Sequence, residues 1–171
     1  EKMVSGMYLG EVCRLVLEDL IAKKVLFGGI APAEFNKKMF FKGEFVSQIL
    51  ADRAHGLTKI KALLQRSGVK DSSPEDRKIV RRVCELVSIR AARISAAAIF
   101  AVITRMDPDI KKRHTVAIDG SVYEKLPGFS ENIKGAVAEL SGARTKKIEI
   151  ALTKDGSGYG AAIIAAVAAR R

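Results

Sequence analysis

The sequence predicts an α/β fold in which long helices come before a C-terminal βαβα unit with parallel strands. Residues 1–112 are dominated by apolar residues at helical spacing. Residues 113–171 contain two short strand-like runs, "HTVAI" (114–118) and "KIEIAL" (147–152). A loop and a helical stretch follow each run, and this alternation is typical of parallel strands joined by helices. The length of 171 residues suits one domain, or a large part of one.

The first two thirds of the chain predict a series of amphipathic helices. They are expected at residues 2–23, from Phe45 to about Ala54, from Leu57 to Gln65, and from Pro74 to about Met106. The longest begins at a strong start signal, with Ser73 as N-cap and Pro74 in the first turn. Its second half, "RAARISAAAIFAV", carries small residues on nearly every face, which predicts a central helix that packs closely against its neighbours.

Two more helices are expected in the last third of the chain. For the helix over 130–140, Ser130 is the expected N-cap, and Phe129 before it is expected to act as a hydrophobic staple. The run "AAIIAAVAA" (161–169) has no polar residue, which predicts a buried helix.

Composition narrows the classes of partner. The formal net charge is +11, but Lys and Arg are scattered in pairs without interleaved aromatic residues, which favours a solvated basic surface over a nucleic-acid interface. Cys13 and Cys84 lie in apolar helical patterns and are expected to be buried free thiols. The two histidines have no metal-ligand spacing. Charges interrupt the apolar runs, so no membrane segment is expected. Both ends look like cuts in a longer protein.

Both predicted strands end in a turn that holds an aspartate, a glycine and a serine. Asp119-Gly120-Ser121 follows the first strand, and Asp155-Gly156-Ser157-Gly158 follows the second. Because ligands of open α/β sheets bind beyond the carboxyl ends of the strands, the two turns are expected to be neighbours and to offer amide groups to phosphate. The alternative for either turn alone is a simple bend without a ligand.

Several segments, in order, resemble the eukaryotic hexokinase family. They are "EKMVSGMYLGEVCRLVL" (1–17), "FVSQI" (45–49), "AARISAAAI" (91–99), "IDGSVYEKLPGF" (118–129) and "DGSGYGAAIIAAV" (155–167). The resemblance covers essentially the whole chain and corresponds to the C-terminal part of the family's large domain. It implies part of an actin-like ATPase (ribonuclease H-like) three-layer fold, with a helical part over 1–112 and a nucleotide-binding βαβα part over 113–171.

The same resemblance implies a function. Hexokinases transfer phosphate from ATP with Mg²⁺ to the 6-hydroxyl of glucose and related hexoses, the first step of glycolysis, which implies hexose and ATP as partners. The alternative within the family is a non-catalytic sugar sensor or regulatory protein. A cytoplasmic location is the default, and an organelle or the mitochondrial surface is the alternative.

By resemblance, Glu1 matches the glutamate that accepts hydrogen bonds from sugar hydroxyls. The residues matched to nucleotide-contact segments are Gly6, Met7, Gly43, Glu44, Phe45, Val46, Ser47, Asp119, Gly120, Ser121, Val122, Tyr123, Glu124, Lys125, Gly156, Ser157 and Gly158. No catalytic residue is expected among these 171, because the family's base aspartate lies upstream of the matched segments. The isolated piece is therefore expected to be inactive.

Some of these residues have a plainer interpretation, and two depart from the family pattern. Met3, Met7 and Tyr8 are typical of a helix core, and Tyr123 is expected to pack on the following helix rather than on adenine. Glu1 also suits a helix N-terminus as a carboxylate that interacts with the dipole. Where this sequence has Gly43, the family usually has a threonine whose hydroxyl faces the nucleotide, so Gly43 offers only its backbone. Lys154 stands where an acidic residue is common, and it is expected to face solvent.

Overall fold

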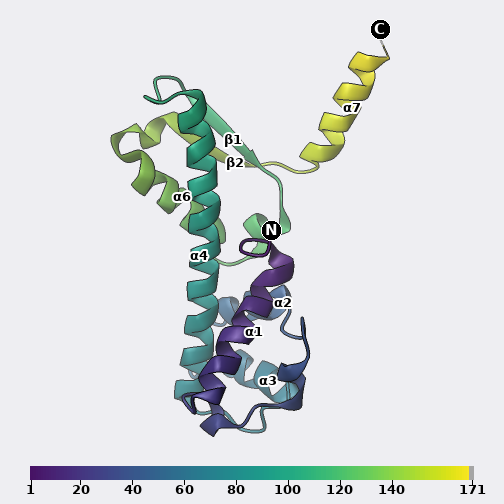
Figure 1. Ribbon diagram of the computed structural model, residues 1–171, viewed down its shortest axis with the longest axis vertical. Helices are drawn as coiled ribbons and strands as arrows, with labels where there is room; N and C mark the ends of the chain where they lie inside the picture. The colour runs from purple at the N-terminus through teal and green to yellow at the C-terminus, as the bar shows by residue number, and fades with distance from the viewer. Residues whose placement is uncertain (170–171) are drawn as a thin grey trace.

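The computed structural model describes residues 1–169, apart from the side chain of Ser157 (Figure 1). The α-helices are α1 (Gly6–Ala22), α2 (Gly43–Ala51), α3 (Thr58–Arg66), α4 (Pro74–Met106), α5 (Ser121–Lys125), α6 (Phe129–Ser141) and α7 (Gly156–Ala168). The 3₁₀ helices are η1 (Phe27–Gly29), η2 (Ala33–Asn36) and η3 (Gly142–Lys147), and the strands are β1 (His114–Ile118) and β2 (Ile148–Leu152).

Helix α4 is the spine of the structure, as the alanine-rich pattern predicted. Its start is fixed by a capping box, in which Ser73 and Asp76 each accept a hydrogen bond from the other's backbone amide. Helices α1, α2 and α6 pack along its length (Figure 1). Ala91, Ala92 and Ala96 are fully buried, because their small side chains let neighbouring helices approach the backbone.

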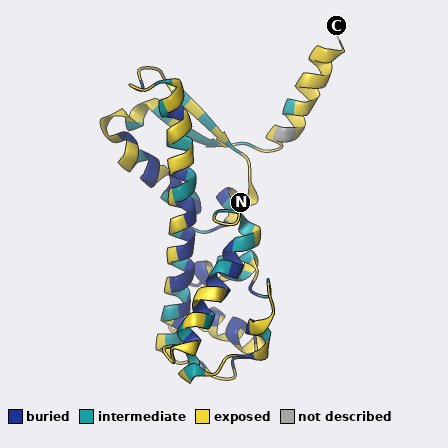
Figure 2. Ribbon diagram, viewed as in Figure 1, coloured by how far each residue is buried: buried dark blue, intermediate teal, exposed yellow. Residues whose placement is uncertain are grey.

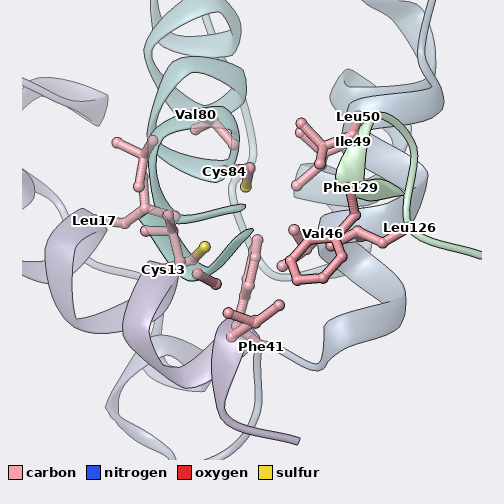
Figure 3. Packing of buried hydrophobic residues seen from close by; sticks show 14 of the residues in the cluster. Cys13, Leu17, Phe41, Val46, Ile49, Leu50, Val80, Cys84, Leu126 and Phe129 are labelled. Atoms are coloured by element: carbon pink, nitrogen blue, oxygen red, sulfur yellow. The ribbon is translucent and has the colours of Figure 1, made fainter. Parts of the chain in front are cut away.

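The hydrophobic core lies between α1, α2, α3 and α4 and extends to α6 (Figure 3). Cys13 on α1 and Cys84 on α4 are free thiols that face each other inside it, and neither has exposed surface. The hydrogen bond with Cys13 and burial together raise the pKa of the Cys84 thiol. The expected burial of both cysteines is therefore confirmed.

The two strands pair in parallel, as predicted. The register runs from His114 opposite Ile148 to Ile118 opposite Leu152. Beyond it, the amide of Thr153 donates to the carbonyl of Ile118 at 2.9 Å, which extends the pairing by one residue. The two strand-end turns therefore leave the sheet at the same edge.

The predicted helix starts at α1, α2 and α6 differ from the structure. The first helix begins at Gly6, not residue 2, because Ser5 accepts the amide of Met7 as its N-cap. Helix α2 begins at Gly43, two residues before the predicted start. Helix α6 begins at Phe129 rather than after Ser130, because Gly128 at φ +77° turns the chain into the helix.

The prediction that residues 161–169 form a buried helix is wrong. Helix α7 points away from the rest of the structure (Figure 1), and its apolar side chains are exposed (Figure 2). Ile163 and Ile164 are 64% and 72% exposed. The reason is that no element among residues 1–169 covers the apolar surface of α7. Met3 and Met7 are also exposed, contrary to their predicted place in a core.

The sequence predicted no segment able to span a membrane, but helix α4 meets that criterion. Within residues 1–169, it contains an 18-residue window that is apolar and long enough to cross a bilayer by composition alone. Length and composition do not assign it there, since the core helix of a globular domain has the same properties. About a third of this window is buried, on the side of α4 that packs against neighbouring helices, and the rest is not covered by residues 1–169.

Candidate functional site

A cavity of about 660 Å³ opens where the starts of α1 and α2 meet α5. Three segments far apart in the sequence form its walls. The first gives Gly6, Met7 and Leu9; the second gives Met39, Lys42, Gly43, Glu44 and Ser47; the third gives Ser121, Val122, Lys125 and Leu126. The structure thus brings together residues from three of the four segments in which nucleotide contacts were predicted, and the segment 156–158 does not line this cavity.

Glycines allow these segments to approach so closely. A Cβ atom on Gly43 would lie 2.6 Å from the carbonyl oxygen of Gly6, and one on Gly6 would lie 2.6 Å from Cγ2 of Val122. One turn further along α1, a Cβ on Gly10 would overlap the carbonyl oxygen of Phe41. Real Cβ atoms do not make such contacts, so only glycine fits this arrangement. Gly43 therefore has a packing role here.

The turns after β1 and β2 are neighbours, as predicted. The amide of Gly156 donates to Oδ2 of Asp119 at 3.0 Å, across 37 residues of sequence. This contact changes one part of the prediction. The Gly156 amide was expected to be free for phosphate, but the Asp119 carboxylate already accepts it, because an aspartate after one parallel strand can reach the turn after the next.

Asp119 and Gly120 lie beside the 660 Å³ cavity rather than in it. They line a second, mostly apolar cavity of about 520 Å³ against α4 and α6. Val122 lines both cavities. Gly158 lies under the Asp155 carboxylate in the first turn of α7, and the side chain of Ser157 is outside the described part of the structure.

Other predicted residues have side chains that do not face the 660 Å³ cavity. Val46 is fully buried, and Phe45 packs edge-on against Phe41 with ring centres 5.4 Å apart. Tyr123 is buried in the core, in agreement with its predicted packing role. Glu124 instead forms an ion pair of 3.1 Å with Lys154, whose side chain is 78% exposed and faces solvent as expected.

Glu1 lies at the exposed start of the chain. Its carbonyl oxygen accepts the amides of Val4 and Ser5, which fixes the turn that leads into α1. Its carboxylate has no hydrogen-bond partner among the described residues, so it is free to accept from a ligand hydroxyl.

Sequence reasoning missed four residues of the cavity wall. They are Leu9, Met39, Lys42 and Leu126. Lys42 is the N-cap residue of α2 and lies exposed at the cavity, where with Lys125 it outweighs the single negative charge of Glu44. The available signal was position, because Lys42 and Leu126 each adjoin a predicted contact segment. Among residues 1–169 there is no cluster of three histidine, cysteine, aspartate or glutamate side chains that would hold a metal ion.

Comparisons with known proteins agree with this arrangement. The family model described as Hexokinase matches residues 1–167. Hexokinase HKDC1 of Homo sapiens is 40% identical over 173 residues, which cover 99% of this chain and 18% of that protein. Hexokinase-2 of Oryza sativa subsp. japonica is 35% identical over 172 residues, which cover 97% of this chain and 35% of that protein.

Solved structures show the same relationship. A hexokinase from Schistosoma mansoni complexed with glucose has a TM-score of 0.85 and 36% identity, covering 98% of this chain and 37% of that one. The predicted fold, part of an actin-like ATPase fold with parallel strands, is thereby confirmed. The chain spans between 18% and 37% of the lengths of these three relatives. With a family match over nearly its whole length, the chain belongs to the hexokinase family.

Proposed function

We propose that this chain forms the nucleotide side of a hexokinase active site, which transfers the γ-phosphate of ATP to the 6-hydroxyl of glucose or a related hexose. The observation that carries the proposal is the 660 Å³ cavity, whose walls come from three of the four segments matched to nucleotide contacts. Its volume lies within the range of roughly 300–1,000 Å³ that is usual for small-molecule sites.

The wall residues divide into apolar and charged groups. Met7, Leu9, Met39 and Leu126 offer apolar surface that suits a base or a ribose face. Lys42 and Lys125 offer ammonium groups that suit the polyphosphate. Gly6 and Gly43 keep the backbone close to the ligand. Mg²⁺ enters with ATP as part of the substrate, bound mainly by phosphate oxygens.

We further propose that Glu1 accepts a hydrogen bond from a sugar hydroxyl. Its support is the family match at the N-terminal segment, together with a carboxylate that has no partner among the described residues. The 171 residues alone are expected to bind nucleotide but not to transfer phosphate. Phosphoryl transfer requires the nucleophile and the γ-phosphate to be held together, and the sequence match supplies only part of such a cleft.

Nucleotide titration of matched lysine variants tests the proposal. Lys125→Ala removes an ammonium group from the cavity and is expected to weaken ADP binding by about tenfold, the value of one charge-assisted hydrogen bond. Lys112→Ala removes the same charge from an exposed position after α4, outside the cavity, and is expected to leave the affinity unchanged. Ser121→Trp fills the cavity and is expected to block binding.

Two results would refute parts of the proposal. Equal effects of Lys125→Ala and Lys112→Ala would mean that nucleotide affinity reflects only net charge. Glucose-dependent ADP release by a protein of the relatives' length, followed in a coupled assay, separates a kinase from a non-catalytic sugar sensor. A sensor would bind glucose without releasing ADP.

A further inference from the structure

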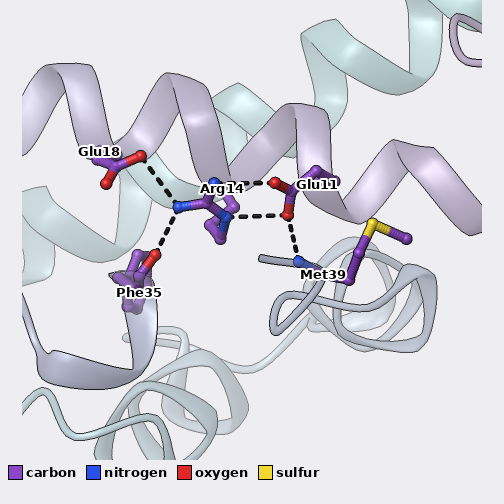
Figure 4. Close-up of polar contacts among 5 residues, drawn as sticks. All are labelled: Glu11, Arg14, Glu18, Phe35 and Met39. Atoms are coloured by element: carbon purple, nitrogen blue, oxygen red, sulfur yellow. Dashed lines mark hydrogen bonds and ion pairs between the residues drawn. The ribbon is translucent and has the colours of Figure 1, made fainter. Parts of the chain in front are cut away.

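Glu11 and Arg14 form a buried ion pair on α1 that faces η2 and the chain just after it (Figure 4). Arg14 donates from Nη2 to Oε1 of Glu11 at 2.8 Å and from Nε to Oε2 at 2.9 Å. The side chain of Arg14 is only 7% exposed and that of Glu11 only 11%. Burying two charges costs free energy that the ion pair alone often fails to recover. Further hydrogen bonds of the two side chains are therefore expected to offset that cost.

Both members of the pair hold backbone outside α1. Arg14 donates from Nη1 to the carbonyl oxygen of Phe35 at 2.5 Å, and also to Glu18 at 3.0 Å. Glu11 accepts the amide of Met39 at 2.7 Å through Oε2. The pair therefore fastens both ends of the segment from Phe35 to Met39 against α1 (Figure 4).

Met39 needs such a contact. Its φ is +63°, in the left-handed region that residues other than glycine rarely occupy. The backbone that follows lines the nucleotide cavity at Lys42 and Gly43, and it passes Gly10 with no room for a methyl group. A change in the backbone of Met39 would therefore redirect this wall of the cavity.

We infer that Glu11, oriented by Arg14, is a positioning residue for the nucleotide cavity. It holds Met39 in the left-handed conformation and so places Lys42 and Gly43 against Gly6. Glu11 itself does not line the cavity, since its carboxylate is occupied by Arg14 and Met39. The inference rests on the proposed function of the cavity. Its structural part concerns only the backbone of residues 39–43.

The test compares Glu11→Gln with Glu18→Gln in the purified protein. Both changes remove one carboxylate from Arg14, but only Glu11 also contacts Met39. A glutamine at 11 has one oxygen where two now accept three hydrogen bonds, so the Met39 contact is weakened. ADP affinity, measured well below each variant's Tm, is expected to fall about tenfold for Glu11→Gln and less than about twofold for Glu18→Gln.

A rescue experiment separates positioning from general stability. Met39→Gly makes φ +63° accessible without strain, so the competent backbone depends less on Glu11. In the Met39→Gly background, adding Glu11→Gln is expected to weaken ADP binding by less than about threefold. Equal losses of affinity with Met and with Gly at position 39 would overturn the inference. So would equal losses for Glu11→Gln and Glu18→Gln.

Hydrogen exchange gives a readout that does not depend on nucleotide. The amides of residues 39–43 are expected to exchange faster in Glu11→Gln than in Glu18→Gln, while the amides of α4 exchange alike in both. If the wild-type protein binds no ADP but the two variants show this difference in exchange, the proposed function fails and the positioning role stands. If ADP binds and the exchange rates are equal, the positioning role fails alone.

Discussion

The Asp119 carboxylate accepts the backbone amide of Gly156 at 3.0 Å, so the turn after one parallel strand is fastened to the turn after the other. This contact lies just beyond the last paired residues, Ile118 and Leu152. It means that the two turns are preorganised as one unit. A phosphate near this edge must be held by donors other than the Gly156 amide.

Asp119→Ala is expected to loosen the turn before α7 with little effect on global stability. Asp119 is exposed, so the loss in free energy of unfolding should be about 1 kcal/mol or less. The Gly156 amide should instead exchange with solvent markedly faster, which NMR can follow. Asp109→Ala, which removes an exposed carboxylate paired with Lys111, is the control and should leave Gly156 unchanged. An unaltered exchange rate at Gly156 in Asp119→Ala would contradict the contact.

Two glycine-to-alanine changes should have opposite signs. In Gly10→Ala the new methyl group overlaps the carbonyl oxygen of Phe41, so destabilisation of about 1–3 kcal/mol or more is expected in urea unfolding. Gly135 lies within α6 and has no atom near the position of a Cβ. Gly135→Ala should therefore stabilise the protein by roughly 0.5–1 kcal/mol, since alanine favours the helix. Destabilisation by both changes would contradict the packing described at Gly10.

Asp107, just after the end of α4, should make the thermal stability of the protein depend on pH in the acidic range. Hydrogen bonds from the amides of Lys112 and Lys111, together with His114 at 3.0 Å, lower the pKa of Asp107 from 3.8 to about 2. A lowered folded-state pKa contributes stability above the unfolded value, which is lost as pH falls from about 4 towards 2. Thermal melts of the wild type should therefore fall more steeply over this range than those of Asp107→Asn. Parallel curves would show that Asp107 makes no such contribution.

The sequence pattern predicts that Ser73 and Ser130 both cap helices, whereas in the structure only Ser73 of these two does so. Ser73→Ala removes the cap of α4 and should cost about 1 kcal/mol of unfolding free energy. The sequence predicts the same cost for Ser130→Ala. In the structure, however, Ser130 lies inside α6 and donates to Glu131, so a change within about 0.5 kcal/mol is expected. Denaturant melts of the two variants decide between these readings. A loss of about 1 kcal/mol for Ser130→Ala would show that it caps the helix after all.

The sequence was sufficient where local chemistry decides structure. Ser73 with Pro74 marked the start of α4, and the run from His114 to Ile118 marked β1. The sequence was not sufficient where burial depends on residues that are distant along the chain. Apolar residues such as Ile163 show that a face would favour burial, but not whether any element covers it. At α6, the left-handed turn at Gly128 placed the helix start ahead of Ser130.

The candidate site was predictable to a similar extent. Motif resemblance selected segments around Gly6, Gly43 and Ser121 that the structure brings to one cavity. It also included Val46, whose side chain faces the core, because contact segments are assigned whole while successive side chains point in different directions around a helix. Met39 was missed because its place in the wall follows from a positive φ and a contact with Glu11, neither of which has a sequence signature.

The facing thiols of Cys13 and Cys84 have a practical consequence. The chain has no tryptophan, and therefore lacks the usual fluorescent reporter of unfolding. Neither sulfur has exposed surface, so a soluble thiol reagent reaches them only when α1 and α4 separate. The rate of labelling therefore measures how often the core opens. Two native side chains thus report the rate of local unfolding of the core without any engineered label.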